Sequence, residues 1–152
     1  MRAVVQRVTA ARVVVENNIV GEIGHGLLVF LGVARGDEKK DIDFMLRKIP
    51  HLRIFDDEEG NLNRSLMDIE GHIMVVSQFT LYGDCRRGLR PSFDQAASPA
   101  LARELYQAFI AGLESKNIAQ VEQGVFGAYM KVEICNDGPV TIVLDSREGS
   151  KT

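Results

Sequence analysis

The order of strand-like and helix-like segments is the feature of this 152-residue chain that most restricts its fold. Short apolar segments rich in valine and isoleucine, which are typical of buried strands, occur at both ends and in the middle of the chain. Only two stretches have the periodicity of an amphipathic helix, and they do not alternate with the strands one by one. This order argues against repeated strand–helix–strand units and predicts an α+β fold with a largely antiparallel sheet.

The element boundaries follow from turn and capping residues. Asp37 is a plausible N-cap for a helix that reaches about Lys48. Ser98 and Pro99 are typical of a helix start, and apolar residues then recur every four positions to about Lys116. Strands are expected at residues 2–8, 12–15, 19–23, 26–33, 73–76, 131–135 and 140–144.

Composition limits the class of protein. The length and the 45% hydrophobic content fit one domain, which we expect over residues 1–146, followed by a polar tail at 147–152. A formal net charge of -3 provides no overall positive field for nucleic acid, so an RNA partner would need local contacts. Two cysteines cannot form a disulfide framework, which favours a reduced, cytoplasmic setting. No apolar run is long enough to span a membrane.

The sequence gives no sign of a metal site. Its three histidines are scattered, and the acidic run at 56–59 lacks the spacing of a calcium loop. We therefore expect neither a metal nor another cofactor.

The apolar run at 73–76 stops abruptly in Ser77-Gln78-Phe79-Thr80. These four residues offer two hydroxyls, an amide and an aromatic ring. One interpretation is a strand that leaves the core, with Ser77 and Thr80 hydrogen-bonded to nearby backbone. The other is a strand that ends at the edge of a pocket.

A second polar stretch, residues 136–141, contains Gly138-Pro139 and is expected to begin with a turn at 136–139. On its own the Gly-Pro bond is expected to be trans, because only about 5–6% of X-Pro bonds in folded proteins are cis. Glycine has no side chain and proline fixes φ, so the pair can present backbone carbonyls rigidly to a ligand.

Four segments in this order resemble the D-aminoacyl-tRNA deacylase family: Met1 to Val8, Ser77-Gln78-Phe79-Thr80-Leu81, Arg90-Pro91-Ser92-Phe93 and Asn136-x-Gly138-Pro139-x-Thr141. The resemblance covers all but the last few residues. It implies a β-barrel-like body with the two main helices packed outside. It also implies a homodimer with a cross-subunit active site. The implied reaction is hydrolysis of the ester that joins a D-amino acid, or glycine, to the 3′ end of tRNA.

The resemblance also implies residue roles. The catalytic group would be Ser77, Gln78, Phe79 and Thr80. Gly138-Pro139 would be cis and would enter the partner's pocket as a filter against L-amino acids. Three further residues would support this segment, namely Arg7, Asn136 and Thr141. Without the resemblance, Arg7 would be interpreted as a solvent-facing charge.

The chemistry of the substrate fits a chain without a Ser-His-Asp arrangement. An aminoacyl ester is already activated, so the protein mainly supplies positioning, oxyanion stabilisation and an oriented water. Backbone amides near Phe79 and Thr80 could bind the oxyanion. The resemblance implies Thr80 as a candidate nucleophile, but the sequence shows no base for its hydroxyl. The resemblance offers an alternative that we favour, in which the 2′-hydroxyl of the tRNA helps activate water and Thr80 positions it.

Two further regions are candidates for binding. Arg86, Arg87 and Arg90 lie on a Gly/Pro-containing loop and would either contact phosphates or form a flexible charged loop. Phe126 and Met130 flank small residues that would either leave room for a ligand or allow a β-bulge.

Two other functions remain open at this point. A small-molecule esterase that depends on Thr80 would turn over simple esters without tRNA. A non-catalytic tRNA- or nucleotide-binding module would bind without releasing product.

Overall fold

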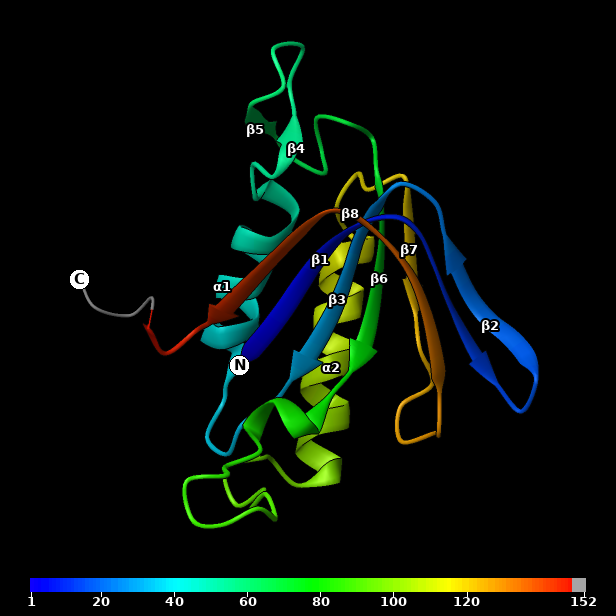
Figure 1. Cartoon of the computed structure of the whole chain (residues 1–152). Coiled ribbons are helices and arrows are strands. Elements are labelled where there is room, and N and C mark those ends of the chain that lie inside the picture. The colour runs from blue at the N-terminus through cyan, green and yellow to red at the C-terminus, as the bar shows by residue number, and fades with distance from the viewer. Residues whose placement is uncertain (149–152) are drawn as a thin grey trace.

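The computed structural model describes residues 1–148 and consists of one large sheet with two main helices (Figure 1). The large sheet has the strand order β2-β1-β3-β6-β7, and β8 pairs with β1 outside this order. β2 pairs with residues 11–15 of β1, β3 with residues 2–8, and β8 with residues along most of its length. Its strands are β1 (Arg2–Val15), β2 (Asn18–Ile23), β3 (Gly26–Gly32), β6 (His72–Ser77), β7 (Gln120–Gln123) and β8 (Lys131–Asp145). A small sheet pairs β4 (Phe55–Asp56) with β5 (Leu62–Arg64). The helices are α1 (Lys39–Lys48) and α2 (Pro99–Glu114), with 3-10 turns η1 (Ile49–His51) and η2 (Phe79–Tyr82).

The large sheet is mixed. β1 runs antiparallel to β2, β3 and β8, which agrees with the largely antiparallel sheet predicted from the sequence. However, β3 and β6 are parallel, and so are β6 and β7. The long connections that contain α1 and α2 make these parallel pairings possible, because they carry the chain back to the other end of the sheet.

The sheet curls until its far strands approach each other. The Gln120 side chain on β7 donates a hydrogen bond to the Glu22 carbonyl of β2 at 3.1 Å. A Cβ on Gly21 of β2 would lie 3.2 Å from the Gln123 carbonyl of β7, so glycine permits this approach. The predicted α+β, barrel-like fold is therefore confirmed.

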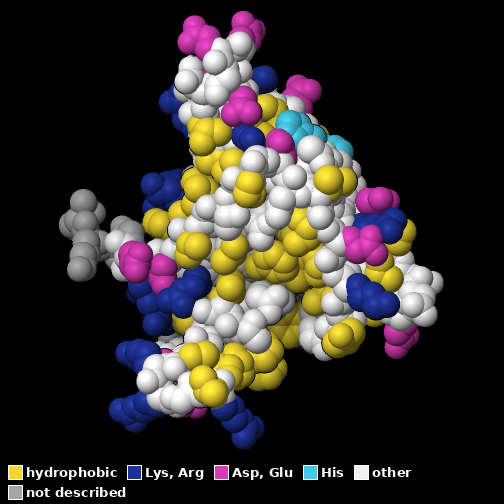
Figure 2. All heavy atoms as spheres, viewed as in Figure 1, with side chains coloured by type: hydrophobic (Ala, Val, Ile, Leu, Met, Phe, Trp, Pro, Cys, Tyr) yellow, Lys and Arg dark blue, Asp and Glu magenta, His cyan; other side chains and the backbone are white. Residues whose placement is uncertain are grey.

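Both helices cover one face of the sheet, behind it in Figure 1. The main core lies between the helices and the sheet and contains large buried side chains such as Tyr106, Phe109, Phe55, Leu27 and Met45. A second cluster around Leu28, Met74 and Val76 lies on the opposite side of the same strands. Figure 2 shows apolar side chains gathered in the middle of this opposite face, which neither helix covers.

Two expected strand breaks are absent. Residues 2–8 and 12–15 belong to the single strand β1, and the turn expected at 136–139 lies inside the single strand β8. The pairing of the two strands is interrupted instead: Gln6 faces Thr141 and Val8 faces Asn136, which leaves residues 137–140 opposite Arg7. The polar segment is a large bulge rather than a terminal turn.

Asp37 does not cap α1, contrary to the expectation from the sequence. The N-cap is Glu38, whose amide hydrogen-bonds to the Asp41 side chain at 2.8 Å. Asp37 is buried and forms an ion pair with the amino group of Met1 at 2.9 Å. A buried carboxylate needs a charged partner, and the nearby ammonium supplies one.

The last described residues, 146–148, follow β8 directly. The Arg147 guanidinium donates to the Arg35 carbonyl at 2.6 Å and pairs with Asp37 at 3.3 Å. Residues 149–152 of the predicted polar tail lie outside the described residues. Within residues 1–148, neither helix is long and apolar enough to cross a membrane.

Candidate active site

The site begins where β6 leaves the sheet. Ser77 still faces Leu31 of β3, and the backbone amide of Gln78 donates to the Leu31 carbonyl at 2.8 Å. The chain then turns into η2 directly above Gly32, where a Cβ would lie 3.0 Å from the Gln78 carbonyl. Glycine at position 32 therefore lets the turn pack closely on the end of β3.

Within this turn, the side chains of the Ser-Gln-Phe-Thr segment point to different partners. The side-chain amide of Gln78 donates to the Thr80 hydroxyl. Phe79 is 56% exposed, and its ring meets Phe93 edge-on at a centroid distance of 5.0 Å. The amides of Phe79 and Thr80 open η2 and have no acceptor among the described residues, as expected for the first amides of a helical turn.

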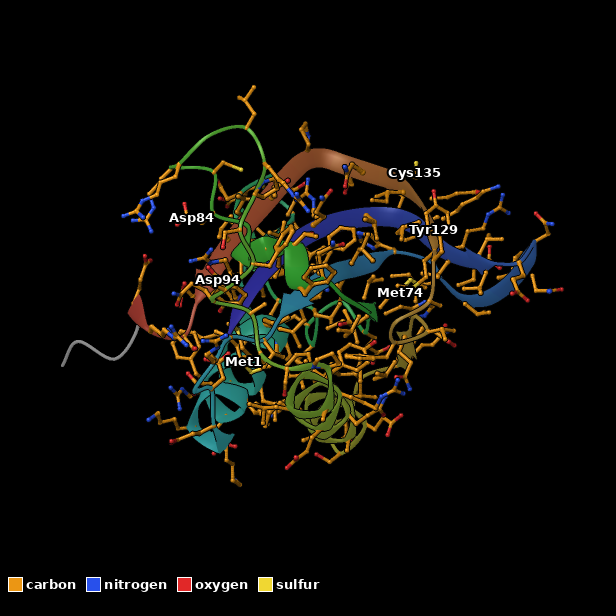
Figure 3. The ribbon with its side chains drawn as sticks, turned by 90° about the horizontal axis from the view of Figure 1, so that it is seen from below. Met1, Met74, Asp84, Asp94, Tyr129 and Cys135 are labelled. Carbon is orange, nitrogen blue, oxygen red and sulfur yellow. The ribbon has the colours of Figure 1, made fainter. Side chains whose placement is uncertain are left out.

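A cavity of about 500 Å³ lies beside the turn. From the segments predicted by sequence, it is lined by Ser77, Gln78, Phe79, Phe126 and Met130. In Figure 3, Tyr129 lies on the opposite side of the molecule from Asp84 and the arginine-containing loop. The structure thus brings residues 77–79 and 126–130 together, although about 50 residues separate them in the sequence.

The start of α2 also lines the cavity, through Pro99 and Ala102, together with Ala97 just before the helix. From the sequence, no functional role was predicted for this helix. The available signal was the run of small residues in its first turn, which leaves space beside the sheet.

The cavity lining contains almost no acid–base chemistry. Its residues are Val33, Val76, Ser77, Gln78, Phe79, Ala97, Pro99, Ala102, Phe126, Gly127, Ala128, Tyr129, Met130 and Val132. Tyr129 alone among them carries an ordinary titratable group, and its side chain is 90% exposed. The lining contains no carboxylate, histidine or lysine, and so it offers no base for the nearby Thr80.

Tyr106 supports the cavity from below. Its buried hydroxyl donates to the Val75 carbonyl at 2.9 Å, and its ring lies 5.8 Å from that of Phe126. Burial raises the pKa of the Tyr106 phenol well above its usual range, so the group stays neutral. On the outer side, the Arg103 guanidinium lies 4.7 Å from the Phe126 ring centre.

The Gly138-Pro139 peptide bond is cis and lies in the bulge of β8. Arg7, 6% exposed, lies directly behind it. Its Nε donates to the Asp137 carbonyl at 3.2 Å and pairs with the Asp137 carboxylate at 3.2 Å. Its Nη1 donates to the Ile54 carbonyl at 2.9 Å, which ties the bulge to the chain before β4.

The bulge and the cavity lie apart within one chain. Ser77 is in register with Leu31 and Ala3, whereas the bulge faces Arg7, four residues further along β1. At about 3.3 Å per residue and 4.8 Å per strand, four residues along and three strands across separate the two by roughly 20 Å. Figure 1 shows the same arrangement, with the bend of β8 at one end of the sheet and η2 at the other.

Asn136 and Thr141 flank the bulge on β8, where both are exposed, and neither lines the cavity. The structure therefore groups the predicted residues into two places. One is the cavity, lined by Ser77, Gln78, Phe79, Phe126 and Met130, with Thr80 next to it but outside the lining. The other is the bulge with Arg7, Asn136 and Thr141.

The arginine loop follows η2. Arg86 forms an ion pair with Asp84 at 2.6 Å, and hydrogen bonds from Arg86 lower the pKa of Asp84 to about 2. Arg87 and Arg90 are exposed and form no ion pair with another described residue. Of the three cations, Arg87 and Arg90 are therefore the ones with free charge.

Within residues 1–148, no group of three or more His, Cys, Asp or Glu side chains is arranged to hold a metal ion. The two cysteines, Cys85 and Cys135, are exposed and unbonded to each other. The candidate chemistry thus rests on hydroxyl, amide and backbone groups.

The fold and the site together define a small α+β protein with an apolar cavity at the end of a sheet strand and backbone amides at its edge. The family model described as D-Tyr-tRNA(Tyr) deacylase matches residues 4–145, and the chain belongs to this family.

Named relatives and solved structures agree with this assignment. A protein of Thermosipho melanesiensis named D-aminoacyl-tRNA deacylase is 55% identical over 148 residues, which cover 97% of this chain and 99% of that protein. A protein of the same name from Clostridioides difficile is 56% identical over 146 residues, which cover 96% and 97%. A solved structure titled c-Myc DNA Unwinding Element Binding Protein superposes with a TM-score of 0.90 at 43% identity, covering 95% of this chain and 98% of that chain. A probable eukaryotic D-amino acid tRNA deacylase shares the fold, with a TM-score of 0.77 at 20% identity over 94% and 97% of the two chains.

Proposed function

We propose that this deacylase-family protein hydrolyses the ester that joins a D-amino acid, or glycine, to the terminal adenosine of tRNA, and that it does so in the cytoplasm. The observation that carries the proposal is the cavity beside η2, whose lining offers amides and a hydroxyl but no base. An activated aminoacyl ester is a substrate for which positioning and oxyanion stabilisation are sufficient help.

In the proposed mechanism, the free amides of Phe79 and Thr80 bind the oxyanion that develops on the ester carbonyl. The 2′-hydroxyl of the terminal adenosine helps activate the attacking water. Thr80, which accepts a hydrogen bond from the Gln78 side chain, positions the attacking water and does not attack the ester itself. The absence of a carboxylate, histidine or lysine from the cavity lining supports this division of roles.

Discrimination between D- and L-amino acids is proposed to come from the backbone of Gly138-Pro139. An L-side chain would be driven against these carbonyls, whereas a D-side chain or the hydrogen of glycine would avoid them. Rejection of this kind works by repulsion and needs no specific pocket for the wrong substrate. Arg7 supports the role because it holds the Asp137 carbonyl and carboxylate from a buried position.

The filter is proposed to act across a homodimer. In one chain the bulge and Ser77, at the start of the segment that carries Thr80, are separated by roughly 20 Å, given ordinary strand spacings. The sheet face that the helices leave uncovered displays apolar side chains (Figure 2). Exposed apolar residues include Val143 of β8 at 64% and Phe79 of η2 at 56%. Apposition of two such faces would bury them and could bring each bulge to the other chain's cavity.

Two substrates and one binding measurement separate this proposal from its rivals. Incubation with D-aminoacyl-tRNA is expected to release the free amino acid, while a chromogenic ester without tRNA should remain uncleaved. Turnover of the simple ester at a comparable rate would instead indicate a small-molecule esterase. Binding of D-aminoacyl-tRNA without release of the amino acid would indicate a non-catalytic binding module.

A further inference from the structure

Arg2 connects three elements that meet beside the site. It lies at the start of β1, directly opposite Asp145 at the end of β8. Its Nε and Nη2 donate to Oδ2 of Asp145 at 3.2 and 3.0 Å. Its remaining nitrogen, Nη1, donates to the Leu81 carbonyl of η2 at 2.8 Å.

The contacts require the shape of an arginine. The planar guanidinium directs two nitrogens to the carboxylate and a third to the carbonyl, and its carbon lies 4.8 Å from the Tyr82 ring centre. A lysine has a single nitrogen and could not hold both partners in this geometry. Asp145 is 10% exposed, so the anchor of this arrangement is nearly buried.

The second partner is the turn that carries Phe79 and Thr80. On the β3 side, this turn is tied to the sheet by the hydrogen bond from the Gln78 amide to the Leu31 carbonyl. The Leu81 carbonyl, at the other end of the turn, is held by Arg2. The two ties bracket the amides and the hydroxyl that the proposed mechanism uses.

We propose that Arg2 is a positioning residue for the reaction: it fixes η2 against the ends of β1 and β8 so that the amides of Phe79 and Thr80 meet the ester carbonyl. This inference rests on the proposed function. Arg2 does not line the cavity, and it acts on the substrate only through the position of the turn.

The chain contains a matched control. Arg12 and Glu133 are also directly opposed on β1 and β8, and their side chains form an ion pair at 2.6 Å. The exposed fractions of Arg2 and Arg12 are similar, at 39% and 44%. Arg12, however, has no hydrogen bond to η2. A comparison of Arg2→Lys with Arg12→Lys therefore isolates the contact with Leu81 from the loss of a cross-strand arginine.

The test measures steady-state deacylation of D-aminoacyl-tRNA, which gives kcat and KM, together with amide hydrogen exchange of Leu81 and Gly83. These amides bond to the Gln78 and Thr80 carbonyls within the turn. Arg2→Lys should lower kcat by about 10- to 100-fold with little change in KM, because small misplacement of reacting groups has effects of this size. It should also accelerate exchange in the turn. Arg12→Lys should leave both quantities within about twofold of wild type, since screened surface pairs contribute little.

The inference is overturned if Arg2→Lys retains wild-type kcat, or if Arg12→Lys lowers it equally. Asp145→Asn covers the case in which Arg2→Lys unfolds: it keeps an oxygen for Arg2 and should give a smaller fall in kcat with faster exchange. Wild-type kcat in that variant, with unchanged exchange, would also overturn the inference. If wild type releases no amino acid, the proposed function fails. Exchange then decides the structural role: acceleration by Arg2→Lys alone supports it, and unchanged exchange overturns it.

Discussion

The Gly138→Ala substitution tests whether the backbone of the bulge discriminates between enantiomers. Gly138 has φ of +120°, a region that side chains of L-residues rarely adopt. A Cβ there would lie 2.9 Å from Cγ2 and 3.0 Å from the amide nitrogen of Val140, and 3.3 Å from Nη2 of Arg7. The segment must therefore shift to accept even a methyl group.

The expected magnitude follows from this geometry. A non-glycine residue in such a conformation costs about 1–3 kcal/mol, and urea unfolding should show a loss of stability of this size. If displacement of the carbonyls weakens the repulsion of L-substrates by about 1.4 kcal/mol, the preference for D over L falls tenfold. We expect a fall of at least this size in the ratio of deacylation rates.

Gly60→Ala is the control for backbone strain alone. Gly60 has φ of +79°, and nothing lies within 4 Å of the position of its Cβ. It should lose about 1–2 kcal/mol of stability and keep the full preference for D-substrates. A Gly138→Ala variant that discriminates as well as wild type would refute the filter.

Three further predictions concern the turn, the loop and the core. Thr80→Ala should retain measurable deacylation, whereas tRNA with a 2′-deoxy terminal adenosine should be cleaved poorly; a trapped acyl-Thr80 adduct would establish covalent catalysis instead. Replacement of Arg87 and Arg90 by alanine should weaken tRNA binding and reduce its salt dependence by about one unit for each lost phosphate contact, and unchanged affinity would show that the loop faces elsewhere. Tyr82→Phe should raise stability by about 1 kcal/mol, because the buried Tyr82 hydroxyl has no partner among the described residues, whereas Tyr106→Phe should lower it by about 0.5–1.5 kcal/mol by removing the bond to Val75. A lower melting temperature for Tyr82→Phe, or a higher one for Tyr106→Phe, would contradict the assignment of these two hydroxyls.

The sequence predicted the elements better than their connections. Ser98 caps α2 through its side chain as expected, because this signal is local. The parallel pairing of β3 with β6 depends on contacts between distant segments, so periodicity could not reveal it. The same limit explains the bulge: residues 136–139 have turn chemistry, but β1 holds both flanks in one continuous strand.

The candidate site was predicted in part for the same reason. The polar end of the strand at Ser77 was visible in the sequence, and so was the small-residue segment beside Phe126. Their meeting at one cavity, and the contribution of Ala102 from α2, depend on how the helix packs against the sheet. Asp37 shows the opposite case, since a local capping signal was overridden by an ion pair with the distant amino group of Met1.

The most direct test of the proposed function is the hydrolysis of D- and L-tyrosine esterified to the same tRNA, measured side by side under single-turnover conditions. We predict that the protein releases D-tyrosine at least tenfold faster than L-tyrosine, a difference of about 1.4 kcal/mol or more between the two transition states. Equal rates for the two enantiomers, or faster release of L-tyrosine, would contradict a chirality-checking deacylase.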